Sequence, residues 1–241
     1  MGKNILIVGA SGEIGQAVAI QLAKEGHHLV LHYNTNRVGI EQIIKQVEDA
    51  SILSVIQSDL TMEASAKNVL SALAFSMDAV IFASGQAYTS LFQDTPETIM
   101  DRMLKLHVKA PWLITQGLLP GMIQKNAGHV LFVTSIWAEV GASMEVVYSS
   151  VKGAQRSFVK ALSKEVSSSG VIVKNISPGY IDTAMNRHLS EDEKHVLFND
   201  IPLRKGGTAE DVAKTAAFLL TDTASRTLLD DTIHVTGGWD P

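Results

Sequence analysis

Residues 4–15 read Asn4-Ile5-Leu6-Ile7-Val8-Gly9-Ala10-Ser11-Gly12-Glu13-Ile14-Gly15, and they join a continuous apolar run to three glycines spaced three apart. The run is typical of a buried strand, and the apolar side chains that follow it over residues 17–23 repeat with helical spacing. Glycines let a backbone turn tightly and approach a pyrophosphate, while the first turn of a helix offers N–H groups and a positive dipole end to the anion. The segment therefore predicts a strand, a turn and a helix that together bind a dinucleotide.

A second segment, residues 135–152, carries candidate catalytic side chains. If the chain is helical from about Val147, Tyr148 and Lys152 lie four residues apart on one helix face. The ammonium would then lower the phenol pKa from about 10 toward the working pH, where a proton is exchanged efficiently. Ser135 follows an apolar strand and offers a hydroxyl that could hold a carbonyl or alcohol oxygen beside the phenol. A Tyr-x-x-x-Lys spacing also arises by chance, so the prediction depends on Ser135 and the glycine turn as well.

The order of the remaining segments predicts the fold. Strands alternate with helices along the chain, which indicates a parallel sheet covered on both faces, with ligands at the carboxyl ends of the strands. We therefore expect an α/β fold, a single-domain Rossmann-like doubly wound parallel sheet of about seven strands, over residues 1–241. The strands are expected at residues 4–9, 28–33, 52–56, 78–83, 129–134, 171–176 and 232–236.

Composition argues against several other classes of protein. The 241 residues carry 20 basic and 25 acidic side chains, a net charge of −5 with no long basic run, so nucleic acid is not expected as a partner. The absence of cysteine excludes disulfides and thiolate metal sites, and the eight histidines show no paired ligand spacing, so no metal is expected. No apolar run suits a signal peptide or approaches the roughly 18 residues of a membrane span. We expect a cytoplasmic protein without a membrane partner.

Taken together, the glycine turn, Ser135, Tyr148 and Lys152 resemble the short-chain dehydrogenase/reductase family over nearly the whole chain. The resemblance implies that these three side chains are catalytic. It also implies a homodimer or homotetramer built on the outer faces of helices at residues 101–118 and 148–166. His107 stands where the family has a fourth catalytic residue, usually Asn, on a proton path from Lys152 to solvent. A histidine titrates near pH 6.5 and could relay protons there, although a lone histidine is more often a packed or surface side chain.

The chain departs from the family pattern in two loops. In the glycine turn Glu13 takes the place of the middle glycine, with Gly12 one position early. A carboxylate near phosphates must point away or cap the helix N-terminus. In Phe82-Ala83-Ser84-Gly85 two asparagines of the family are missing, so Gly85 is expected to keep its turn while some polar contacts are lost.

The residues after the second strand favour NADP(H) over NAD(H). A carboxylate there would bind the adenosine ribose and repel a 2′-phosphate, whereas Tyr33, Asn34 and Arg37 could accept that phosphate; alternatively, Arg37 is only a solvated helix residue. The resemblance places Asp59 on the adenine, the alternative being a helix cap, and the turn around Pro178 on the nicotinamide. The residues expected to bind the cofactor are Gly9, Ser11, Gly12, Glu13, Ile14, Gly15, Tyr33, Asn34, Arg37, Asp59, Leu60, Ala83, Ser84, Gly85, Tyr148, Lys152, Pro178, Gly179, Ile181 and Thr183.

The predicted function is NADPH-dependent reduction of a ketone to a secondary alcohol. Ser135 holds the oxygen, Tyr148 donates the proton, and Lys152 binds the nicotinamide ribose. The chain overall, especially residues 201–235, resembles 3-oxoacyl-acyl carrier protein reductases. Residues 107–111, 135–137, 141–146 and 152–155 look more like the branch that reduces an aminopentanone group on a lysine of elongation factor P. The ketone is accordingly expected on acyl carrier protein, on a protein lysine, or free.

Charge distinguishes these substrates. An acidic carrier protein needs a basic docking patch, for which Lys105, Lys109 and Arg156 are scattered candidates, whereas an amine would be attracted by Glu145 or Glu139 near the pocket. The polar residues 186–200 are expected to cover the substrate as a mobile lid; alternatively, their charges form only a solvated face. A non-catalytic dinucleotide-sensing protein is a further alternative, motivated by the missing asparagines, Glu13 and His107, although Ser135, Tyr148 and Lys152 all stand in place.

Overall fold

The chain alternates strands and helices, as predicted. The structure is a computed structural model that describes residues 2–186, 189–221, 225, 227–228 and 231–241. Within this part of the chain, seven strands form one parallel sheet. They are β1 (Asn4–Val8), β2 (His28–Tyr33), β3 (Ile52–Gln57), β4 (Ala79–Phe82), β5 (Gly128–Val133), β6 (Val171–Pro178) and β7 (Thr232–Val235). The predicted strands are all confirmed, with bounds that differ by at most two residues.

The sheet has the strand order β3-β2-β1-β4-β5-β6-β7, which confirms the doubly wound parallel architecture. The chain starts in the middle of the sheet, runs outward to β3, and then crosses back to β4 beside β1. In sheets of this kind the ligand binds at the carboxyl ends of the strands, near the point where the direction of winding reverses. The glycine turn directly follows β1, so it lies at that point.

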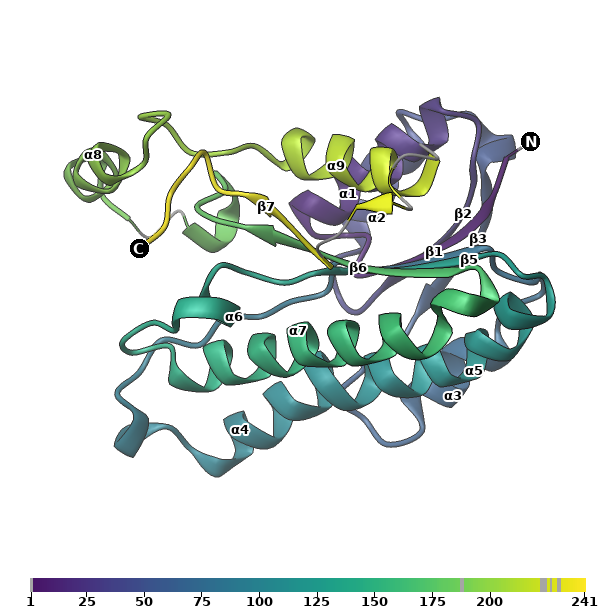
Figure 1. Ribbon diagram of the computed structural model, residues 1–241, viewed down its shortest axis with the longest axis horizontal. Helices are drawn as coiled ribbons and strands as arrows, with labels where there is room; N and C mark the ends of the chain where they lie inside the picture. The colour runs from purple at the N-terminus through teal and green to yellow at the C-terminus, as the bar shows by residue number, and fades with distance from the viewer. Residues whose placement is uncertain (1, 187–188, 222–224, 226, 229–230) are drawn as a thin grey trace.

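Two helical layers cover the sheet because its strands are apolar on both faces. Side chains alternate along a strand, so Ile5 and Ile7 of β1 face one core while Leu6 and Val8 face the other. One layer holds α1 (Glu13–Lys24), α2 (Arg37–Ile44) and α9 (Ala209–Thr221). The other holds α3 (Ser65–Ser71), α4 (Glu97–Leu104), α5 (Ala110–Gln124) and α7 (Val146–Val166). Figure 1 shows the two layers above and below the sheet.

Helix α4 continues into α5 through a π-helical segment, η3 (Lys105–Lys109), where the sequence predicted one uninterrupted helix. Pro111 explains the interruption, because its ring nitrogen cannot donate to the carbonyl of His107 and the ring crowds that carbonyl. The orphaned oxygen is satisfied from another helix, since Gln155 Nε2 on α7 donates to it at 2.7 Å. The proline thus fastens the middle of α4–α5 to α7.

Six further elements complete the described part of the chain. They are η1 (Asp49–Ser51), η2 (Phe92–Asp94), α6 (Trp137–Val140), η4 (Ser167–Ser169), η5 (Ala184–Asn186) and α8 (Glu191–Asp200). Of these, η1 and η4 directly precede β3 and β6, and the others lie in connections that follow strands. Helix α8 begins with a capping box in which Ser190 Oγ accepts from the N–H of Glu193. None of the helices in the described part of the chain is long and apolar enough to span a membrane.

The tight glycine turn leads to a prediction about stability. A Cβ on Gly15 would lie 2.2 Å from the carbonyl oxygen of Gly9, whereas a Cβ on Gly12 would meet that oxygen at 3.7 Å. We expect Gly15→Ala to lower the free energy of unfolding by about 1–3 kcal/mol, because backbone cannot move aside cheaply. Gly12→Ala, the matched control, should stay within about 0.5 kcal/mol of the wild type. Urea unfolding measures both, and equal effects would contradict the close approach at Gly15.

Candidate active site

A cavity of about 1160 Å³ opens at the carboxyl edge of the sheet. Its walls come from the glycine turn, the loop after β4, the segment after β5, the start of α7 and the loop after β6, and α8 contributes Glu193 and Leu197 to the lining. These segments are far apart in the sequence, and they meet because parallel strands all end at one edge.

The three predicted catalytic side chains share one wall of this cavity. Ser135 follows β5, and its Oγ accepts a hydrogen bond from the N–H of Trp137 at 3.2 Å. Tyr148 and Lys152 lie on α7, which begins at Val146 as expected from the helical spacing. The Lys152 Nζ lies 5.7 Å from the centre of the Tyr148 ring and donates to the carbonyl of Val133 at 2.9 Å.

The predicted fall in the pKa of Tyr148 is wrong for this structure. Burial raises the pKa of Tyr148 to about 12; the hydrogen bond from Ser135 lowers it, and the carboxylate of Glu145 raises it further. The physical reason is that a dehydrated phenolate is far less stable than a dehydrated phenol. The Tyr148 phenol is therefore protonated throughout the neutral pH range.

Lys152 is dehydrated as well. It is almost wholly buried, and burial lowers the pKa of its amino group to about 7. The amine consequently exchanges its own proton near neutral pH, where an ordinary lysine would stay charged. Burial destabilises the charged form of both groups, so it lowers the pKa of the Lys152 amine and raises the pKa of the Tyr148 phenol, and this effect outweighs the attraction between their opposite charges.

His107 lies beside these two residues. Its ring stands edge-on to the Tyr148 ring, with centres 6.0 Å apart, and burial together with the charge of Lys152 lowers its pKa to about 3. Its Nε2 lies 3.3 Å from the backbone nitrogen and 3.1 Å from the backbone oxygen of Gln86, so the tautomer decides which bond forms. Its Nδ1 has no hydrogen-bond partner among the described residues. A relay through His107 would therefore use the neutral ring, and this role stays a prediction.

Most of the predicted cofactor residues line the same cavity. They are Gly12, Glu13, Ile14, Gly15, Ala83, Ser84, Gly85, Tyr148, Lys152, Pro178, Gly179, Ile181 and Thr183. Gly9 and Ser11 lie within the glycine turn but do not line the cavity. The continuous lining from the glycine turn to the loop after β6 fits an elongated dinucleotide, because backbone without side chains faces the cavity at Gly12 and Gly85.

The second group of predicted cofactor residues lies at the ends of β2 and β3, outside this cavity. The Arg37 side chain is 65% exposed; its Nη1 lies 3.4 Å from the Tyr33 hydroxyl and its Nε lies 3.5 Å from Glu41. The backbone carbonyl of Asn34 accepts a hydrogen bond from Gln57 Nε2 at 3.0 Å. Asp59 does not cap α3, the alternative considered above, because its Oδ1 accepts from the N–H and hydroxyl of Thr61 four residues before that helix. Leu60 is buried beside it.

Glu13 points away from the glycine turn, as one of the two expected arrangements required. Its Oε2 accepts from the N–H of Ala184 at 3.0 Å, a short way along the chain from the Pro178 turn. The contact joins two segments that are 171 residues apart and that both line the cavity.

The structure separates the two carboxylates proposed to attract an amine. Glu145 lines the cavity as the N-cap residue of α7, and its Oε1 accepts from the Thr89 hydroxyl at 3.4 Å. Glu139 does not line the cavity, so the prediction for it is wrong: its carboxylate turns the other way and contacts Ser177, His234 and Arg156. The one-turn helix α6 rotates successive side chains by about 100°, so proximity to Ser135 in sequence did not place Glu139 in the pocket.

Sequence reasoning missed several cavity residues. Trp137 and Trp239 line the cavity and pack edge to face with ring centres 5.4 Å apart. Trp239 follows β7, so the rule that ligands bind at the carboxyl ends of strands would have found it. Leu189, Glu193 and Leu197 of the predicted lid also line the cavity, while residues 187–188 of that segment lie outside the described residues.

Comparisons with known proteins agree with this architecture. The model of the short chain dehydrogenase family matches residues 3–194. The "uncharacterized oxidoreductase YmfI" of Bacillus subtilis is 37% identical over 241 residues, 99% of each chain. The 3-oxoacyl-acyl-carrier-protein reductase FabG of Rickettsia conorii is 31% identical over 98% of this chain and 96% of its own. A gluconate 5-dehydrogenase from Burkholderia cenocepacia, solved with NADP and tartrate, has a TM-score of 0.88 at 20% identity, with 98% and 94% of the chains covered, a likeness of fold.

The burial of Lys152 predicts a pH-dependent stability. Its pKa is about 7 in the folded protein and 10.5 unperturbed, so between these values the unfolded chain binds more protons and wild-type stability rises with pH. We expect Lys152→Met to be more stable than the wild type at pH 7, by about 1–3 kcal/mol. The advantage should shrink by pH 9.5.

Urea unfolding at both pH values measures this difference. Lys164→Met on the exposed side of the same helix is the matched control and should show no such pH dependence. A constant difference between wild type and Lys152→Met would show that the amine is not dehydrated.

Proposed function

Because the chain belongs to the short-chain dehydrogenase family, whose model matches residues 3–194, we propose that it is an NADPH-dependent carbonyl reductase. Family membership makes it an oxidoreductase that uses a nicotinamide dinucleotide and acts on a CH–OH or C=O group. One observation carries the proposal: Ser135, Tyr148 and Lys152 share a wall of the cavity that the glycine turn also lines. The dinucleotide supplies hydride to the carbonyl carbon when bound.

In this mechanism the protein's side chains act on the carbonyl oxygen. The Trp137 N–H holds Ser135 Oγ as an acceptor, and the hydroxyl hydrogen, which is directed at Tyr148 in this structure, would donate to the substrate oxygen once substrate lies between them. Tyr148 then gives its phenolic proton to that oxygen as the carbon is reduced, so that a ketone becomes a secondary alcohol. The raised pKa of Tyr148 keeps the phenol in the protonated form that this step consumes.

In our proposal Lys152 returns a proton to Tyr148 after the phenol has given its own proton to the substrate. Its pKa near 7 lets the ammonium give up a proton to the Tyr148 phenolate, and the charged amine stabilises that phenolate while it lasts. Lys152 would also bind the nicotinamide ribose. The ring of His107, beside both residues, is proposed to carry protons onward as a neutral relay.

We assign NADPH rather than NADH on the residues that follow β2. Arg37 offers a guanidinium, and its neighbours Tyr33 and Asn34 offer polar groups, at the position where a 2′-phosphate of the adenosine ribose would lie. Glu41 is its only carboxylate contact among the described residues. Because that ion pair is largely exposed, it would yield readily to a phosphate.

Two carriers of the ketone are proposed, as the sequence suggested. The relatives that are 3-oxoacyl-acyl-carrier-protein reductases, such as that of Rickettsia conorii, support a 3-ketoacyl thioester. The charge of the cavity supports an aminoketone on a protein lysine instead. Among its described lining residues Lys152 is the only cation, while Glu13, Glu145 and Glu193 are acidic. Glu145 is near enough to Tyr148 to raise its pKa, so it lies close to the reacting carbonyl.

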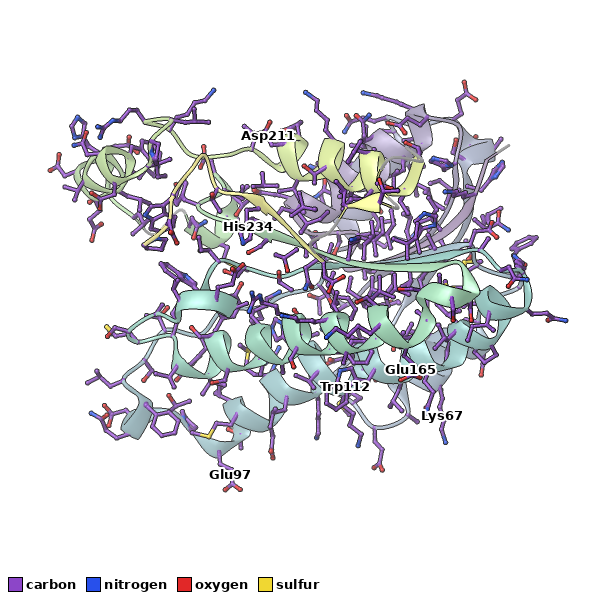
Figure 2. The ribbon with its side chains drawn as sticks, in the orientation of Figure 1. Lys67, Glu97, Trp112, Glu165, Asp211 and His234 are labelled. Atoms are coloured by element: carbon purple, nitrogen blue, oxygen red, sulfur yellow. The ribbon has the colours of Figure 1, made fainter. Side chains whose placement is uncertain are left out.

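Helix α5 presents an apolar surface on which an oligomer could form. Large apolar side chains are exposed on α5, Trp112 and Leu113 among them, which supports a homodimer or homotetramer built on this layer (Figure 2). A cytoplasmic location fits the zero cysteine count.

A dinucleotide-sensing protein is the remaining alternative. It would bind cofactor without turnover, so a turnover assay with a ketone distinguishes it from a reductase.

We expect the purified protein to oxidise NADPH in the presence of a 3-ketoacyl thioester or an aminoketone, and to do so with a kcat/KM at least about tenfold higher than with NADH. Tyr148→Phe should reduce kcat by about 10²–10⁴-fold, because it removes the proton donor. Tight NADPH binding without turnover of either ketone would favour the sensor.

The cofactor preference is tested at Arg37. Arg37→Glu should raise KM for NADPH about tenfold and leave KM for NADH unchanged.

The substrate class is tested at Glu145. We expect Glu145→Gln to lower kcat/KM for a positively charged aminoketone about tenfold, since it removes the attracting charge, while a neutral ketoacyl thioester is unaffected. Glu63→Gln, at an exposed residue remote from the cavity lining, is the matched control. Equal losses for both substrates would count against a cationic substrate.

A further inference from the structure

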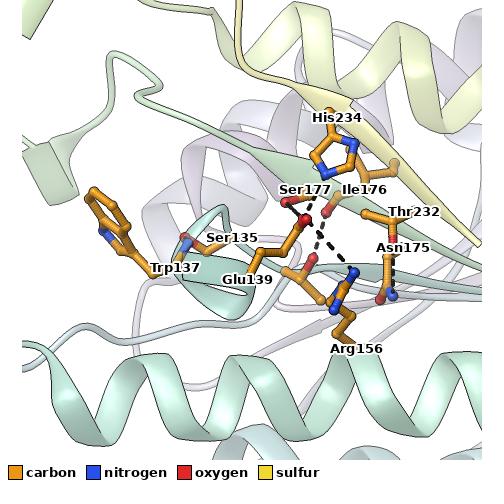
Figure 3. Close-up of polar contacts among 10 residues, drawn as sticks. Ser135, Trp137, Glu139, Arg156, Asn175, Ile176, Ser177, Thr232 and His234 are labelled. Atoms are coloured by element: carbon orange, nitrogen blue, oxygen red, sulfur yellow. Dashed lines mark hydrogen bonds and ion pairs between the residues drawn. The ribbon is translucent and has the colours of Figure 1, made fainter. Parts of the chain in front are cut away.

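Glu139 lies behind the cavity wall, where four elements meet. It belongs to α6, the single helical turn after Ser135. Its Oε1 accepts from the Ser177 hydroxyl at 3.1 Å and lies 2.7 Å from His234 Nε2, as Figure 3 shows. Its Oε2 lies 3.8 Å from Arg156, at ion-pair distance. One carboxylate therefore joins α6 to β6, β7 and α7.

Each partner of Glu139 adjoins a segment of the site. Ser177 directly precedes Pro178, which begins the turn proposed to embrace the nicotinamide. Arg156 is four residues after Lys152 on α7, one helical turn away. His234 lies in β7, which leads to the cavity residue Trp239. A shift of Glu139 would therefore change the position of α6, the short helix that follows Ser135, relative to α7, β6 and β7.

The turn that carries Glu139 also orients Ser135. The Trp137 N–H, one residue into α6, binds Ser135 Oγ at 3.2 Å. The Ile136 N–H binds the carbonyl of Pro178 at 2.9 Å. Because these two backbone contacts depend on where α6 lies, the direction of the Ser135 hydroxyl follows the position of the turn.

The contacts of Glu139 are hard to replace. Its side chain is only 21% exposed, and Ser177 is wholly buried. The Nε of Arg156 is buried and has no hydrogen-bond partner among the described residues. Removing the carboxylate would leave a buried hydroxyl and a half-buried guanidinium without their acceptor, at a cost that α6 could relieve by moving.

We propose that Glu139 is a positioning residue for the reduction: by joining the Ser135 turn to α7 and to the ends of β6 and β7, it sets the Ser135 hydroxyl against the Tyr148 phenol. The inference rests on the proposed function. It gives a role to a carboxylate that does not line the cavity.

The kinetic test compares Glu139→Ala and Glu139→Gln with the wild type and with Glu165→Ala, an exposed glutamate on α7 (Figure 2). We expect Glu139→Ala to lower kcat about 10–100-fold, with KM for NADPH changed less than about threefold, because the oxygen holder is displaced while the cofactor residues stay. Glu139→Gln should recover most of the loss, since its amide oxygen still accepts from Ser177. Glu165→Ala should behave as the wild type. A kcat for Glu139→Ala within twofold of wild type, or a loss confined to KM for NADPH, would overturn the proposal.

A second readout does not need turnover. Trp137 sits in the same turn as Glu139, and its ring packs against Trp239 with an interplanar angle of 75°. We expect Glu139→Ala to change the near-ultraviolet circular dichroism of this pair while the far-ultraviolet spectrum stays that of the wild type. An unchanged near-ultraviolet spectrum would overturn the positioning role of Glu139, whether or not the wild type reduces a ketone. A wild type that reduces no ketone would instead defeat the proposed function.

Should Glu139→Ala fail to fold, His234→Asn tests the same connection at an exposed position. It removes one of the three contacts and should lower kcat by about threefold to tenfold in a folded protein. A folded His234→Asn variant that keeps the wild-type kcat and the wild-type near-ultraviolet spectrum would overturn the proposal.

Discussion

The dehydration of Lys152 is the constraint on which the rest of the site depends. Its amino group is enclosed between the end of β5 and α7, where the carbonyl of Val133 accepts its hydrogen bond at 2.9 Å. This neutral acceptor compensates only part of the lost hydration, so the charged form is destabilised and the pKa falls to about 7. The same burial raises the pKa of Tyr148. The enclosure therefore brings the amine into the neutral range and keeps the phenol protonated.

A proline helps to hold this enclosure together. Pro111 leaves the His107 carbonyl without a helical donor. Gln155, on the same helix α7 as Tyr148 and Lys152, donates a hydrogen bond to that carbonyl instead. The π segment that results turns the His107 ring against the Tyr148 ring. The hydrogen bond that is missing within α5 is thus replaced by one between two helices, and the His107 ring is held within the site.

Three glutamates show how the fold assigns different roles to the same side chain. Glu13 accepts a hydrogen bond from the backbone of Ala184, Glu145 lines the cavity near the phenol, and Glu139 joins four elements without lining the cavity. Each starts a helix or lies in its first turns, where a carboxylate is locally favoured by the helix dipole. Their different partners arise from the ends of other strands.

The sequence alone determined the strands, the doubly wound order and the segments that meet at the carboxyl edge. Each of these follows from local patterns, namely the apolar run before Gly9, the glycine spacing and the helical spacing of Tyr148 and Lys152. It did not determine the pKa of Tyr148, the direction of Glu139 or the π turn at His107. Those depend on dehydration and on partners such as Val133, Ser177 and Gln155, which are distant in the chain. Only the packed tertiary structure decides them, because the energy of a charge or a polar group is set by everything that surrounds it.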